Sequence, residues 1–120
     1  MSEQAVSVLL VEDDIDSAEE LAELLESYDM TVTLAHTVGQ ALDKARQRPF
    51  AVALIDVGLG RESGLDLAAA WHGSGPCIVL LTGSPVTETQ MVSFAQPVPP
   101  VLIKPLDVSQ LLDIIAPCQS

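Results

Sequence analysis

The order of apolar segments along the chain limits its fold more than any other feature. Short, nearly continuous apolar runs alternate with segments whose apolar residues recur at helical spacing. The runs predict strands at Val6–Val11, Met30–Leu34, Ala51–Ile55, Cys77–Leu81 and Val101–Ile103. The helical patterns cover residues 18–28, 38–45, 65–71, 86–94 and 108–115, and the fourth pattern is weak. Strands that alternate with helices predict a parallel sheet with right-handed crossovers and helices on both faces.

The character of each strand suggests its place in the sheet. Val6–Val11 and Ala51–Ile55 are apolar almost throughout, as in strands buried on both faces, whereas Met30–Leu34 alternates and predicts an edge strand. This fits an α/β, flavodoxin-like (βα)5 three-layer sandwich with a parallel five-stranded sheet in the order 2-1-3-4-5. With 120 residues, 48% of them apolar, and no evident linker or repeat, we expect one domain over residues 1–120.

Composition excludes several classes of function. The net charge of −12 repels phosphate backbones and anionic lipids, so we expect neither a nucleic acid nor a membrane partner. No apolar run approaches the length of a membrane span, and the N-terminal stretch lacks the basic region of a signal peptide. We therefore expect a cytoplasmic protein. Cys77 and Cys118 lack metal-binding or redox-motif spacing, which predicts two free thiols.

Polar residues follow four of the predicted strands. In an open parallel sheet, ligands bind in the crevice beyond the carboxyl ends of the strands. The residues delivered there are Glu12 and Asp13 after the first strand, Asp56 after the third, Thr82 after the fourth and Lys104 after the fifth. Any one of these could be a solvated turn residue or a helix cap. Together they predict a site, because acids, a hydroxyl and an amine converge on one crevice.

The chemistry of the acids points to a cation. Glu12, Asp13 and Asp56 offer only oxygen atoms, which suits a hard divalent ion such as Mg²⁺ or Mn²⁺. Such an ion would also relieve the repulsion between neighbouring carboxylates. Beside a metal ion, Asp56 could attack a phosphoryl group as a carboxylate nucleophile and form an aspartyl phosphate.

The remaining residues of the crevice suit a phosphoryl group. Lys104 can hold one phosphoryl oxygen as a point charge, and the hydroxyl of Thr82 can donate to another. Gly58 and Gly83 leave room for an incoming donor.

These residues lie in motifs that resemble the response-regulator receiver domain of two-component signalling, of the chemotaxis-regulator type. The matching motifs are LLVEDD, ALIDVGLGRESG, VLLTG and LIKP, and the spacing from Asp56 to Gly64 is that of the family. The resemblance extends over essentially the whole chain.

The resemblance implies a role for each residue of the crevice. It implies that Asp56 is phosphorylated, that Thr82 is the switch hydroxyl and that Lys104, with Gly83 nearby, binds the phosphoryl group. The Mg²⁺ ligands would be Asp13, Asp56 and the backbone carbonyl of Gly58, with Glu12 acting directly or through a water molecule. A cis peptide bond before Pro105 is also implied.

The resemblance further implies partners and a mode of action. A histidine kinase or a histidine phosphotransfer protein would donate the phosphoryl group, and a downstream protein would recognise the result. The domain would be a switch and not an enzyme, beyond Mg²⁺-dependent self-phosphorylation and autodephosphorylation.

Asp14 would cap the first helix, with Ile15 as the first helical residue. His36 and His72 are expected to be exposed at the ends of elements.

Two positions depart from the family pattern and keep alternatives open. Val101 stands where an aromatic residue is usual, and Gly60 stands where a proline is common. The chain could thus be a receiver-fold interaction module whose phosphorylation switch is weakened or lost. It could also be a stand-alone receiver or one excised from a hybrid histidine kinase. A flavodoxin or an aspartate-nucleophile phosphatase is disfavoured, because the first loop is acidic and Gly58 replaces the second acid of the phosphatases.

Overall fold

The computed structural model describes residues 6–59, 62–73, 75–83, 94 and 98–118. Within them, the main sheet contains β1 (Val6–Val11), β2 (Met30–Ala35), β3 (Val52–Asp56), β6 (Cys77–Thr82) and β7 (Val101–Ile103). Two short strands, β4 (Gly58–Leu59) and β5 (Glu62–Ser63), pair separately and antiparallel. The helices are α1 (Ile15–Glu26), α2 (Val38–Gln47), α3 (Gly64–Trp71) and α5 (Val108–Ile115), and the 3-10 turn η1 (Ala116–Cys118) follows α5.

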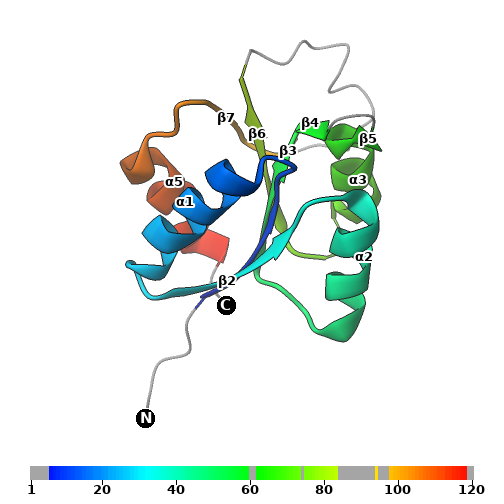
Figure 1. Ribbon diagram of the computed structural model, residues 1–120, viewed down its shortest axis with the longest axis horizontal. Coiled ribbons are helices and arrows are strands. Elements are labelled where there is room, and N and C mark those ends of the chain that lie inside the picture. The colour runs from blue at the N-terminus through cyan, green and yellow to red at the C-terminus, as the bar shows by residue number, and fades with distance from the viewer. Residues whose placement is uncertain (1–5, 60–61, 74, 84–93, 95–97, 119–120) are drawn as a thin grey trace.

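The main sheet has the predicted order. Its strands are arranged β2-β1-β3-β6-β7, and each pair of neighbours is parallel. This is the order 2-1-3-4-5 once the short β4 and β5 are set aside, and β2 lies at an edge as its alternating sequence predicts. Figure 1 shows α1 and α5 on one face of this sheet and α2 and α3 on the other. The predicted α/β, flavodoxin-like three-layer fold is confirmed.

The core has two halves, one on each face of the sheet. Alternate residues of the central strands point to opposite faces, as a strand requires. Leu9, Ala53 and Leu80 belong to the half beneath α2 and α3, which includes Ala41 and Leu67. The second half lies beneath α1 and α5 and contains Val8, Leu10, Leu54, Val79, Leu81, Ala18, Leu25, Leu111 and Ile115. Aliphatic side chains thus fill both halves, with Phe50 and Phe94 as the buried rings among the described residues.

Side chains cap the N-terminus of every described helix. Asp14 is the N-cap of α1, as predicted, and its Oδ1 accepts a hydrogen bond from the amide of Ser17 at 3.3 Å. The corresponding acceptors are Thr37 for α2, Ser63 for α3 and Asp107 for α5. Each cap satisfies amide groups that the first turn of a helix leaves unpaired, so local sequence fixes where the helices begin.

The start of α3 approaches the end of β3 very closely. A Cβ atom built on Gly64 would lie 1.9 Å from the carbonyl oxygen of Asp56 and 3.1 Å from Cγ2 of Ile55. Only glycine fits there without moving the backbone of Asp56. The close packing of α3 against β3 therefore requires glycine at position 64.

Some predictions fall outside the described residues, and one pair of strands was not predicted. The helix predicted at 86–94 lies outside the described residues except for Phe94, and so does Gly60. The β4–β5 pair was not predicted. No helix in the described ranges is long and apolar enough to cross a membrane.

Candidate functional site

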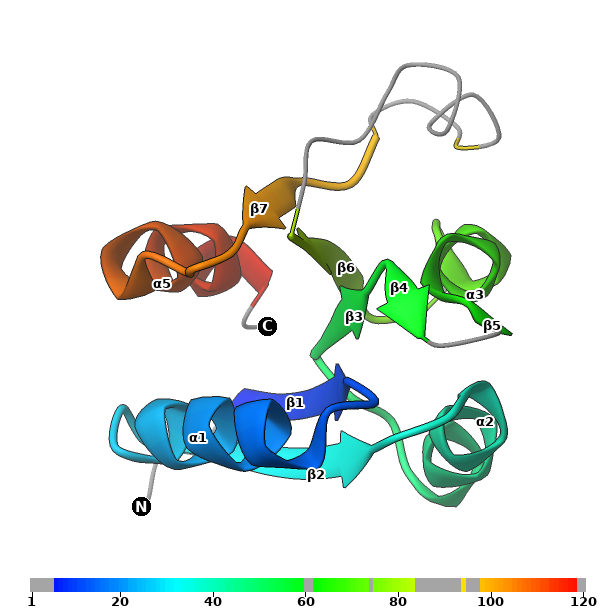
Figure 2. The same cartoon turned by 45° about the horizontal axis from the view of Figure 1, so that its top comes forward.

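The acidic, hydroxyl and amine side chains lie at the carboxyl ends of the parallel strands. Glu12 and Asp13 follow β1, Asp56 and Thr82 are the last residues of β3 and β6, and Lys104 follows β7. Figure 2 shows β4 beside the end of β3, next to α3. Because the strands are parallel, their polar residues meet at one edge, and we call this place the acid pocket. Its members are Glu12, Asp13, Asp56 and Lys104.

Lys104 holds two carboxylates of the acid pocket together. Its Nζ lies 2.6 Å from Oε2 of Glu12 and 2.6 Å from Oδ2 of Asp56. The side chains of Glu12 and Asp56 are 5% and 10% exposed, and that of Lys104 is 33% exposed. A single ammonium group therefore bridges two nearly buried anions, contributed by strands that are distant in sequence.

Burial and hydrogen bonding change the protonation chemistry of this bridge. Burial, and next the hydrogen bond with Asp56, raise the pKa of Glu12, and the bond from Lys104 opposes only part of that rise. Burial alone would lower the pKa of Lys104, but the hydrogen bonds it donates to Asp56 and Glu12 outweigh burial and the pKa is raised. Lys104 therefore stays charged, and the carboxylates of Glu12 and Asp56 share its ammonium group.

The third acid completes a group that could hold a metal ion. One carboxylate oxygen each from Glu12, Asp13 and Asp56 lie within 4.8 Å of one another, and Asp13 is the exposed member. Three carboxylates and one ammonium leave two uncompensated negative charges. Three carboxylate oxygens at this spacing fit a hard divalent cation.

The loop after β3 fixes the orientation of Asp56. Its Oδ1 accepts a hydrogen bond from the amide of Gly58 at 2.8 Å, while Oδ2 accepts from Lys104. The carbonyl of Gly58 as a metal ligand stays a prediction. The two oxygens of Asp56 are thus held differently, one by the backbone amide of Gly58 and one by the side chain of Lys104.

The other predicted site residues lie around the same pocket. Thr82 is buried at the end of β6, and its carbonyl accepts a hydrogen bond from the amide of Lys104 at 2.7 Å. Gly83 is exposed, and a Cβ atom there would meet nothing within 4 Å. The peptide bond between Lys104 and Pro105 is cis, the isomer that the family resemblance implies.

Sequence reasoning missed two contacts that anchor this edge. His36 and His72 were both expected to be exposed, but both are half-buried. The Nδ1 of His36 lies 2.9 Å from the carbonyl oxygen of Glu12. Since a carbonyl only accepts, Nδ1 carries the proton. Glu62 of β5 accepts a hydrogen bond from the amide of Val38 at 3.0 Å, at the first turn of α2. Neither contact has a local signal, because each joins residues from separate elements.

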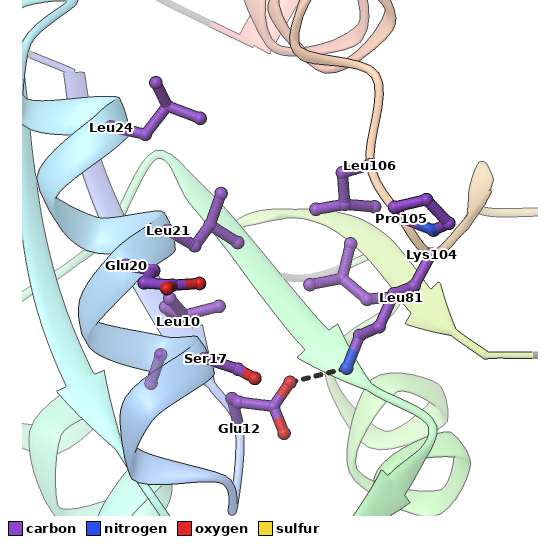
Figure 3. A pocket seen from close by; sticks show the side chains of 11 residues that line it. Leu10, Glu12, Ser17, Glu20, Leu21, Leu24, Leu81, Lys104, Pro105 and Leu106 are labelled. Atoms are coloured by element: carbon purple, nitrogen blue, oxygen red, sulfur yellow. Dashed lines mark hydrogen bonds and ion pairs between the residues drawn. The ribbon is translucent and has the colours of Figure 1, made fainter.

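A groove opens beside the acid pocket, between α1 and the segment after β7. Its volume is about 330 Å³, and Figure 3 shows Leu21 and Leu24 of α1 opposite Pro105 and Leu106. The ion pair of Glu12 and Lys104 forms one end of the groove. The site therefore has a polar centre and an apolar flank.

Known proteins share this sequence pattern. "Transcriptional regulatory protein ZraR" of Klebsiella oxytoca is 30% identical over 113 residues, which are 92% of this chain and 26% of that protein. "Acid tolerance regulatory protein ActR" of Sinorhizobium medicae strain WSM419 is 32% identical over 108 residues, 88% of this chain and 56% of that protein. This chain therefore spans only about a quarter to about half the length of these curated relatives.

A solved structure and a family comparison point to the same family as these two regulatory proteins. A response regulator protein from Burkholderia pseudomallei, crystallised "with a phosphorylated aspartic acid, calcium ion and citrate", is 28% identical with a TM-score of 0.81. That match covers 92% of this chain and 66% of the other. Residues 8–116 match the family described as "Response regulator receiver domain". Since that match takes in every strand end that builds the acid pocket, the chain belongs to the response regulator receiver domains.

Proposed function

We propose that Asp56 accepts a phosphoryl group from a partner's phosphohistidine and that the modified domain presents a changed interaction surface. The observation that carries this proposal is the convergence of three carboxylates and Lys104 on one pocket, with Asp56 at its centre. The receiver family and the relative with a phosphorylated aspartic acid support the same residue type as the acceptor.

A divalent cation, Mg²⁺ or Mn²⁺, belongs to this proposal. The pocket offers oxygen donors and carries two uncompensated negative charges, which fits such an ion. Asp13, Asp56 and the carbonyl of Gly58 would hold it, with Glu12 directly or through water. When bound, the ion supplies positive charge that offsets the repulsion between Asp56 and an incoming phosphoryl group. The relative from Burkholderia pseudomallei holds a calcium ion together with its phosphorylated aspartic acid.

The residues of this chain have distinct parts in the transfer. The amide of Gly58 holds Oδ1 of Asp56 throughout, and we assign the attack to Oδ2, which Lys104 holds before the transfer. As the bond from Oδ2 to phosphorus forms, the bond from phosphorus to the donor imidazole breaks, and the imidazole takes up a proton. Lys104, released from Oδ2, then binds a phosphoryl oxygen, and the hydroxyl of Thr82 binds another. The transfer thus exchanges one partner of Lys104 for another.

The setting of the transfer follows from the same evidence. We propose a cytoplasmic domain that receives phosphate from a histidine kinase or a histidine phosphotransfer protein and signals to a downstream protein. We assign it no turnover of its own beyond self-phosphorylation and autodephosphorylation at Asp56. The relatives named as transcriptional regulators are longer proteins, and for the present 120 residues the net charge of −12 argues against direct contact with nucleic acid.

One observation favours a second candidate, a receiver-fold interaction module with a weakened switch. Val101 of β7 is half-buried and packs against the core half beneath α2 and α3. A small aliphatic side chain there has no ring to swing between inner and outer positions. In this candidate, changes at Thr82 would not reach the surface around β7.

The first experiment tests phosphorylation by intact mass. The protein is incubated with a small phosphodonor such as acetyl phosphate, with Mg²⁺ or with a chelator, alongside Asp56→Asn and Asp66→Asn. Asp66 is a matched control because it is an exposed aspartate on α3. We expect one Mg²⁺-dependent phosphoryl adduct in the wild type and in Asp66→Asn. An equal adduct in Asp56→Asn would refute the assignment.

The second experiment separates the two candidates. Backbone NMR shifts are compared before and after addition of beryllofluoride with Mg²⁺, a mimic of the aspartyl phosphate. A working switch predicts shifts that spread from Thr82 and Lys104 to Val101 and Ile103. Shifts confined to residues that line the acid pocket would favour the interaction module.

A further inference from the structure

The fold brings two distant cysteines to one cavity at the end of the sheet opposite the acid pocket. Cys77 is the first residue of β6, and Cys118 is the last residue of η1. Both line a cavity of about 460 Å³ with Pro76, Val79 and Ile114. Figure 1 shows the C-terminal turn, in red, far from β4 and β5. Both cysteines are free thiols, as the sequence predicted, but their proximity was not foreseen.

The two thiols have unlike surroundings. Cys77 is exposed, whereas Cys118 is partly buried and its Sγ donates to the carbonyl of Ile114 at 3.6 Å. Burial first, and then a side-chain hydrogen bond with Cys77, raises the pKa of Cys118 to about 12. Cys118 therefore stays protonated at neutral pH, and Cys77 is the sulfur that a reagent in solution meets first.

We propose that Cys77 and Cys118 form a reversible intramolecular disulfide that fastens the C-terminal turn to the start of β6. The cavity that both cysteines line carries this inference, which goes beyond the phosphorylation switch.

The oxidant is a low-molecular-weight disulfide, such as oxidised glutathione. The thiolate of Cys77 attacks one of its sulfurs, forms a mixed disulfide and releases one small thiolate. Cys118 then loses its proton to that small thiolate or to solvent and attacks the sulfur of Cys77. The second small thiolate leaves and is protonated in turn. Two cysteine thiols are oxidised by two electrons, and one small disulfide is reduced to two thiols.

The bond would restrain the last helix of the fold. Leu111 and Ile115 of α5 are fully buried against the sheet, and η1 continues from that helix. A link from Cys118 to β6 closes a long loop of chain and lowers the entropy of the unfolded state. We expect the oxidised protein to unfold at a higher temperature than the reduced protein.

The test uses the whole chain, fully reduced and then equilibrated with oxidised and reduced glutathione. Intact mass and thiol alkylation follow the products at low protein concentration. We expect a species lighter by two hydrogens, without alkylatable thiol, at least tenfold more abundant than the mixed disulfide. Cys118→Ser should stop at the mixed disulfide on Cys77, and Cys77→Ser should form little adduct. A reductant should restore the starting mass and unfolding temperature.

Two results would overturn the inference. One is a wild type that stops at the mixed disulfide as Cys118→Ser does. The other is a product joined between chains through Cys77. The double variant Cys77→Ser/Cys118→Ser is the control for direct effects of glutathione. Because it has no cysteine, its unfolding temperature must not respond to glutathione. The bond lies at the opposite end of the sheet from Asp56, so neither result bears on phosphorylation.

Discussion

Replacing Asp13 by asparagine should stabilise the metal-free protein and abolish its response to Mg²⁺. Asp13 is the exposed member of the acid pocket, and its carboxylate lies within 4.8 Å of those of Glu12 and Asp56. The substitution keeps the size of the side chain and removes its charge. It therefore removes two like-charge repulsions while it deletes one of the proposed metal ligands.

The magnitude follows from Coulomb's law. At 4.8 Å, two unit charges repel by about 3.5 kcal/mol at an effective dielectric constant of about 20, and by about 0.9 kcal/mol in water. Because Asp13 is exposed, the lower figure applies, which gives about 2 kcal/mol for the two repulsions. Loss of its attraction to Lys104 reduces this, and a net gain of about 1 kcal/mol remains. In the wild type, Mg²⁺ at about 100 times its dissociation constant should add about 2.7 kcal/mol.

Urea unfolding measures both effects. Wild type, Asp13→Asn and Asp113→Asn are unfolded in chelator and in excess Mg²⁺. Asp113 is exposed on α5, away from the pocket, and controls for the change in net charge. The expected order in chelator is Asp13→Asn above wild type, and in Mg²⁺ the reverse. An Asp13→Asn protein that is less stable than wild type in chelator, or that keeps the full response to Mg²⁺, would refute the electrostatic reasoning.

Three further outcomes are expected. Gly64→Ala should lower the unfolding free energy by about 2 kcal/mol or more, because its Cβ would meet the carbonyl of Asp56 at 1.9 Å. Gly39→Ala, where the Cβ has room, is its control in urea unfolding. Asp14→Ala should cost about 1 kcal/mol through loss of the α1 cap, and Asp14→Asn should retain most of that stability by the same measurement. The raised pKa of Cys118 adds stability that is complete below its unfolded value of 9.0 and is lost as pH rises towards about 12. Denaturation at several pH values should show this decline in reduced wild type and a smaller one in Cys118→Ser.

Periodicity was sufficient for most of the fold. The predicted strands Val6–Val11 and Val101–Ile103 match β1 and β7 residue for residue, because burial on the sheet demands apolar runs of that length. The apolar residues of the first helix predicted its body, and the Asp14 cap predicted its start at Ile15; the helix ends at Glu26, two residues before the apolar pattern does. The β4–β5 pair has no periodic signal, because each of its strands has only two residues.

The sequence also predicted which residues gather at the site, but it did not predict the hydrogen bonds and ion pairs between them. Parallel strands must deliver the residues after them to one edge, so the gathering of Glu12, Asp56 and Lys104 followed from topology alone. That Lys104 would bridge both acids depends on side-chain reach across three strands. The contact of His36 with Glu12 and the cavity shared by Cys77 and Cys118 depend on tertiary packing, which no spacing in the sequence encodes.

The hydrogen bond from Val38 to Glu62 makes one backbone amide a reporter of the loop after Asp56. Val38 is the first residue of α2, a position whose amide has no partner within its own helix. Its protection from solvent deuterium therefore depends on the carboxylate that β5 supplies. Whenever the β4–β5 pair separates from α2, that single amide loses its acceptor while the rest of the helix keeps its bonds. Deuterium uptake at Val38 would thus report the loss of the contact between β5 and α2, close to the proposed phosphorylation site, without a label on the site itself.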